Sequence, residues 1–129
     1  TFLSELHFLD KSAFETSLLI YPESYKDFQD YLDFVDTAND ILAEFGYEGI
    51  YQIASFHPDY RFEHTQKVDA ANYTNRSPYP ILHLLRESSL EKAISNYEKV
   101  ENIPVNNEKL ARQKGIHYFE DILHRIKKQ

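Results

Sequence analysis

The sequence predicts an α+β domain that is rich in helix, with two strands, a helix between them, and three to four helices in the C-terminal half. Two observations carry most of this prediction. An apolar stripe at helical spacing runs through residues 24–45 and is flanked by two short apolar runs, and amphipathic periodicity returns after residue 88. The 129 residues fit one domain, and the 42% hydrophobic share is enough to build a core.

The first half of the chain predicts, in order, a helix, a strand, a helix and a strand at residues 2–9, 14–22, 24–45 and 49–56. Ser24 is placed to cap the long helix, and Gly46 follows it at the position that favours left-handed backbone. The short apolar run that ends at Pro22 has the length of a buried strand. If both strands share one sheet, the strand–helix–strand order predicts a parallel pair with a right-handed crossover.

The second half predicts helices only, at residues 80–87, 89–99, 106–114 and 116–128. Pro80 suits the first position of a helix, and Ser88 with Glu91 has the spacing of a capping box. Asn106 or Asn107 can cap the next helix, and Gly115 is expected to end it.

Composition excludes several classes of function. The formal net charge of -7 argues against nucleic acid and against an anionic membrane surface as partners. No apolar run approaches the roughly 20 residues of a bilayer crossing, and the first residues lack the basic start of a signal peptide, so we expect a cytoplasmic protein. The chain begins with Thr and contains no Met, which predicts that a native N-terminal segment is missing from it.

Familiar catalytic motifs are absent from the sequence. It has no cysteine, no glycine-rich phosphate loop and no GxSxG nucleophile turn. It also lacks an array of aromatic and basic residues of the kind that binds RNA.

Residues 55–80 form a connection that is dense in hydrogen-bonding side chains and contains no glycine. His57 follows a predicted strand, where sites of open α/β folds lie, and Asp59 could set its tautomer. Arg76 precedes the predicted helix start near Pro80, and a guanidinium beside free helix amides favours an anion. The candidate catalytic residues are His57, Asp59 and His83, and the candidate ligand-binding residues are Tyr60, Asn72, Asn75, Arg76, Tyr79 and Arg86.

Each of these features also has a structural interpretation. The side chains of the 55–80 connection could satisfy its own backbone amides, and Pro58 could simply rigidify a turn. The trio of His57, Asp59 and His83 resembles a ligand set for zinc or iron, but its spacing matches no strong motif, and we predict no metal site. The cofactor stays unknown.

Two hypotheses therefore remain. In the first, the chain is an enzyme or a small-ligand domain whose candidate residues converge on one cleft for an anionic small molecule. In the second, the polar connection is a scaffold, and the protein is a non-catalytic interaction module whose tyrosine-rich surface binds a protein partner. The sequence does not indicate an oligomeric state.

Three stretches, ETSLLIYP, IASFHPDYRF and NYTNRSPYPILHLLRE, resemble the bacterial family called domain of unknown function 1415. The resemblance runs from about Glu15 to Glu91. Family members also carry an upstream segment with an NLCPFA-like motif, which this chain lacks. The resemblance implies that the 72–86 motif acts as a unit, but it implies no particular activity.

Overall fold

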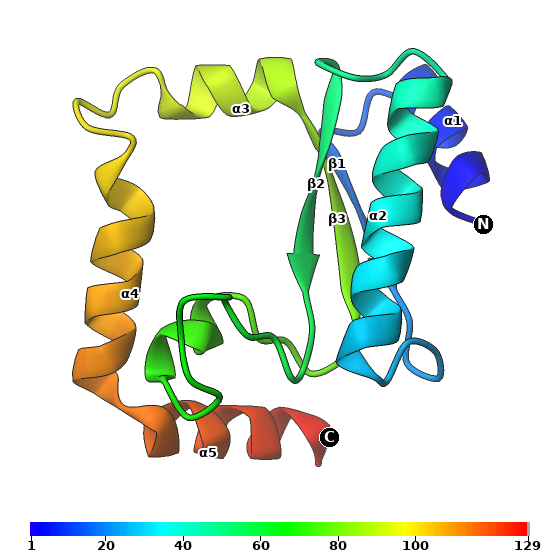
Figure 1. The fold of residues 1–129 in the computed structure, drawn as a ribbon. Coiled ribbons are helices and arrows are strands. Elements are labelled where there is room, and N and C mark those ends of the chain that lie inside the picture. Colours follow the sequence, from blue (N-terminus) through cyan, green and yellow to red (C-terminus); the bar gives the residue numbers. More distant parts are fainter. Residues whose placement is uncertain (129) are drawn as a thin grey trace.

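The computed structural model describes residues 1–128 and shows an α+β fold, as predicted (Figure 1). The sheet has three strands in the order β1 (Thr16–Ile20), β3 (Ile81–Arg86) and β2 (Tyr51–Phe56). The helices within the described residues are α1 (Phe2–Lys11), α2 (Phe28–Glu44), α3 (Glu87–Ile94), α4 (Asn102–Lys114), α5 (Ile116–Lys127) and the short 3₁₀ helix η1 (Ala70–Thr74).

The pairing in the sheet corrects two predictions. The segment 80–87, predicted as a helix, contains the central strand β3. Because β3 is antiparallel to both neighbours, β1 and β2 run in the same direction without being hydrogen-bonded to each other. The predicted parallel pair is therefore wrong, although both strands do belong to one sheet.

The hydrophobic core lies between the sheet and the helices α1 and α2, which Figure 1 shows together on one side of the strands. Leu82 and Leu84 of β3 are fully buried there, against Leu6 of α1 and Tyr31 of α2. A fully buried Leu contributes about 2 kcal/mol relative to an exposed one, so these contacts fix α1 and α2 on the sheet.

Several helix ends differ from prediction. Asp27, not Ser24, caps α2, because its carboxylate accepts from the amide of Asp30. The predicted capping box at Ser88 is wrong, since α3 already begins at Glu87 without a side-chain cap. The helix predicted at 106–114 starts earlier, at Asn102, where a proline in the first turn is tolerated.

The other face of the sheet carries the side chains that point away from α1 and α2. We call it the open sheet face. Its residues alternate with the core residues along each strand and are Thr16, Leu18, Ile20, Gln52, Ala54, Phe56, Ile81, His83 and Leu85. Leu18 is 58% exposed and Ile20 is 51% exposed, so the face presents aliphatic surface. No described helix is long and apolar enough to cross a membrane.

Candidate functional site

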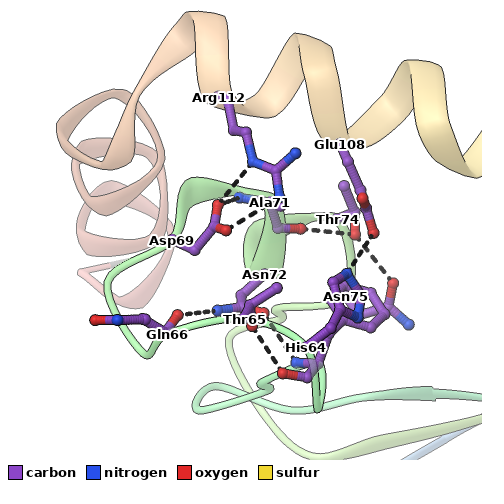
Figure 2. A network of polar contacts seen from close by, with 11 residues as sticks. His64, Thr65, Gln66, Asp69, Ala71, Asn72, Thr74, Asn75, Glu108 and Arg112 are labelled. Atoms are coloured by element: carbon purple, nitrogen blue, oxygen red, sulfur yellow. Dashed lines mark hydrogen bonds and ion pairs between the residues drawn. The ribbon is translucent and has the colours of Figure 1, made fainter.

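Most polar side chains of the connection between β2 and β3 hydrogen-bond the connection itself. Asn72 is buried, and its Oδ1 accepts from the amide of Phe62 and the hydroxyl of Thr65 at 2.9 Å each. Its Nδ2 donates to the carbonyl of Gln66. Figure 2 shows Asn72 at the centre of this network. Its amide therefore organises the loop, and its burial leaves a ligand without access to it.

Arg76 and Asn75 are engaged in the same way. The guanidinium of Arg76 donates to the carbonyls of Tyr60 and Lys67, and it lies 4.5 Å from the centre of the Tyr73 ring. Asn75 donates from Nδ2 to the carbonyl of Ser55 at 2.9 Å. The structural interpretation of these two residues fits their geometry, since both join segments of the loop.

His57 is fully buried between the rings of Phe28 and Tyr31. Its Nδ1 accepts the amide of Asp59 at 2.9 Å, which leaves the proton on Nε2 to be donated to the carbonyl of Tyr25 at 2.8 Å. These two hydrogen bonds, one to each loop, therefore set the tautomer of His57. His57 positions those loops, and a ligand has no access to its imidazole.

The loop that His57 holds is conformationally strained. Tyr25 has a φ of 57°, in the left-handed region that non-glycine residues rarely adopt. Its ring stacks on Phe34 with the ring centres 4.0 Å apart. Such strain persists only where surrounding contacts fix it, and it is found often at binding sites.

Arg86 lies at the other end of β3, five residues and about 16 Å along the strand from Ile81. Its guanidinium donates to the carbonyls of Leu9, Ser12 and Phe14 and to the hydroxyl of Tyr51. It thereby binds the C-terminal end of α1 to the sheet. The expected convergence of His57, Arg76 and Arg86 on one cleft is therefore not observed, and His83 and Arg86 do not share a helix face.

His83 lies in the middle row of the open sheet face, between Leu18 of β1 and Ala54 of β2. Partial burial lowers the pKa of its imidazole, with no hydrogen bond within residues 1–128 to offset that effect. His57, Asp59 and His83 do not gather, and no group of three potential metal-ligating side chains is found in the described residues.

Two of the candidate residues, Asp59 and Tyr79, do line a common cleft. It has a volume of about 470 Å³ and lies where β1 and β2 end and β3 begins. We call it the proline cleft. Its lining residues are Pro22, Glu23, Lys26, Pro58, Asp59, Pro78, Tyr79, Pro80 and Lys127.

Proline rigidifies this cleft. Four of the five prolines of the chain line it, and each fixes its own φ. The hydrogen bond from His57 to Tyr25 fixes the loop that carries Glu23 and Lys26. The cleft is therefore largely formed before any ligand arrives, which lowers the entropic cost of binding.

The charges in the proline cleft are of both signs. Lys26 lies 3.7 Å from Glu23, and both side chains are largely exposed, so the pair is weak. Lys127 of α5 makes no ion pair with residues 1–128, and Asp59 supplies a second carboxylate. The cleft can therefore hold an anion while also offering a hydrogen-bond acceptor.

Sequence reasoning missed Lys26 and Lys127, because both lie outside residues 55–86. A pattern in the sequence pointed to Lys26, because the segment YPESYK follows β1 just as HPDY follows β2. The two strands run in the same direction, so both loops begin at the same end of the sheet. Nothing in the sequence placed the end of α5 beside these loops.

Fold and cleft together define a small α+β domain with a three-stranded antiparallel sheet and a rigid polar cleft at one end of it. The chain belongs to the family described as protein of unknown function (DUF1415), whose sequence model matches residues 1–121. No curated protein and no solved structure matches the chain.

Proposed function

We propose that this protein is a small-ligand-binding domain and that the proline cleft binds a small anionic molecule. One observation carries the proposal: three loops made rigid by proline, and the end of α5, bring Lys26, Lys127 and the phenol of Tyr79 to one cleft. Tyr79 is 41% exposed in a rigid loop, as expected for a side chain that contacts a ligand.

The residues of the cleft have complementary roles in this proposal. The ammonium groups of Lys26 and Lys127 attract the anionic group, while Tyr79 packs against the body of the molecule. Asp59 and Glu23 accept hydrogen bonds, which favours an anion that also carries a hydroxyl or amino group. If the protein catalyses a reaction of the bound molecule, we expect the carboxylate of Asp59 to act as the general acid or base.

The test is a titration of the protein with inorganic phosphate and with citrate, followed by amide chemical shifts in two-dimensional NMR. Saturable shifts are expected around Asp59 and Tyr79. The double variant Lys26→Gln/Lys127→Gln should weaken binding, whereas the matched control Lys92→Gln/Lys109→Gln, on exposed faces of α3 and α4, should not. Shifts that are absent, or that are equal in both double variants, would contradict the proposal.

Arg76→Ala separates this proposal from the original interpretation of the loop. Because the guanidinium of Arg76 is already bound to two carbonyls, the variant should lower stability and leave citrate affinity unchanged at a temperature where it is folded. A loss of citrate affinity in the folded variant would show that Arg76 contributes to ligand binding.

A second candidate function is protein interaction, and the open sheet face favours it. Leu18 and Ile20 present exposed aliphatic side chains on this face. Sedimentation at increasing concentration tests this. Association is expected in the wild type and should be lost in Leu18→Lys but kept in Ile126→Lys, which changes an exposed residue of α5. A monomer at every concentration would count against it.

The expected cytoplasmic location and the absence of nucleic-acid partners stay predictions, and the net charge of -7 supports the second of these.

A further inference from the structure

A second concave site lies in the corner between α4 and α5, with η1 as its floor. Figure 1 shows the sharp turn between the two helices, where Gly115 has a φ of 85°. The space has a volume of about 380 Å³, which is within the range of small-molecule pockets. We call it the corner groove, and its lining residues are Tyr73, Thr74, Asn107, Leu110, Ala111, Lys114, Tyr118 and Phe119.

The corner is fixed to η1 through one side of α4. Arg112 makes two hydrogen bonds of 3.1 Å to the carboxylate of Asp69, which Figure 2 shows directly beside η1. Ala111 is the buried residue of α4, and its small side chain lets the helix approach closely. The groove wall is thereby held in place while Leu110 remains uncovered.

Five of the eight lining residues are aromatic or aliphatic, and three of these five are aromatic. Tyr73 and Phe119 stack with their ring centres 5.1 Å apart, and Tyr118 meets Phe119 edge-on. Leu110 is 53% exposed and Tyr118 is 46% exposed, so each presents apolar surface that the chain itself does not bury. An apolar ligand would gain from removing this surface from water.

One charged group lines the groove, and it is positive. The ammonium of Lys114 lies 4.9 Å from the centre of the Tyr118 ring, and no carboxylate within residues 1–128 forms an ion pair with it. The other lining residues are uncharged. Charge complementarity therefore selects a ligand with one negative charge and an apolar body.

We propose that the corner groove binds a small amphipathic monoanion, either an aromatic or a medium-chain alkyl carboxylate. The carboxylate contacts Lys114, and the apolar body lies between Leu110 and Phe119. The side-chain amide of Asn107 borders the groove and can donate a hydrogen bond to the carboxylate. This site differs from the proline cleft, which has charges of both signs and rigid proline loops.

The test compares octanoate with octanol, which share an apolar body but differ in charge. Binding is measured by calorimetry and located by amide chemical shifts. Octanoate is expected to bind more tightly than octanol, with shifts in α4, α5 and η1. Lys114→Gln should weaken octanoate about threefold or more, the upper range of an exposed ion pair, and leave octanol unchanged. The matched control Lys109→Gln, on the same helix, should change neither.

Leu110→Ser tests the apolar wall and should weaken both molecules. Since Leu110 is exposed, this variant should keep its thermal stability. The proposal is overturned if Lys114→Gln and Lys109→Gln bind octanoate equally, if octanol binds as tightly as octanoate, or if the shifts lie elsewhere. Lys127→Gln, which changes the proline cleft, should leave octanoate affinity unchanged. The two sites are therefore tested independently, and a negative result for the corner groove says nothing about the proposed function of the proline cleft.

Discussion

His57 hydrogen-bonds two loops at once, through Nε2 to the carbonyl of Tyr25 and through Nδ1 from the amide of Asp59. A buried polar group that loses its partner costs about 1–3 kcal/mol. The imidazole therefore stabilises the strained Tyr25 and the rim of the proline cleft together. The sequence suggests His57 as a general base, and the structure places its imidazole in the interior with both ring nitrogens hydrogen-bonded.

We predict that His57→Phe lowers the free energy of unfolding by about 2 kcal/mol or more, because the apolar ring fills the space without either hydrogen bond. Urea unfolding measures this. The control His64→Phe, at an exposed position, should stay within about 0.5 kcal/mol of the wild type. Equal stabilities for the two variants would mean that other contacts hold the Tyr25 loop.

Arg86 is the second candidate residue whose side chain is engaged by the protein itself. We predict that Arg86→Lys lowers the free energy of unfolding by about 1.5–3 kcal/mol, since an ammonium cannot reproduce the fork of bonds to three carbonyls and the Tyr51 hydroxyl. Urea unfolding is again the measurement, with Arg125→Lys on α5 as control. Citrate affinity of the folded variant should not change, and a clear loss would place Arg86 in a ligand site.

The sequence identified the polar loop but could not say where its side chains point. Asn72, Arg76 and Asn75 have the groups that a ligand site needs, and backbone carbonyls need the same donors. Only the structure shows that these donors bind the backbone carbonyls of Gln66, Tyr60 and Ser55.

At the scale of elements, the helix pattern was predictable where one face is buried and the other is solvated, as in α2. The prediction from periodicity failed for β3, because this strand carries apolar residues on both faces. Leu82 and Leu84 face the core, while Ile81 and Leu85 lie on the open sheet face, so the two-residue period is hidden. Pairing with β1 and β2 then overrides the helix preference of Leu.

The attachment of α4 to η1 depends on the ion pair of Arg112 and Asp69. The hydrogen bond from Arg112 lowers the pKa of Asp69, so this pair stabilises the folded state above the ordinary carboxyl pKa of 3.8 and is lost as the pH falls through the depressed value. We predict that Arg112→Gln speeds amide hydrogen exchange in residues 102–114 severalfold at neutral pH.

Hydrogen exchange followed by mass spectrometry measures this effect, with Arg125→Gln as control. The exchange of β3 should stay unchanged, because the sheet does not rest on α4. Protection of α4 that is the same in the variant and the wild type would show that Ala111 and the aromatic contacts alone hold the helix.

For the whole molecule, the core between the sheet and α1–α2 contains tyrosines that cannot ionise without losing burial. Burial raises the pKa of Tyr21 and of Tyr51 to about 12, and it raises the pKa of Tyr31 as well. Tyr31 joins α2 to the sheet, because its hydroxyl donates to the carbonyl of Ile81 and accepts the amide of Phe56. The unfolded chain ionises near pH 10.

The stability that these tyrosines contribute is therefore complete below pH 10 and is lost as the pH rises from 10 through 12. We predict that the urea midpoint falls over this range while phenolate absorbance shows the exposed tyrosines titrating first. Tyr31→Phe should be less stable at neutral pH, because it loses both hydrogen bonds, but its midpoint should fall less at high pH. If all ten tyrosines titrated together near pH 10 with the midpoint unchanged, the phenols would not lie in a common core.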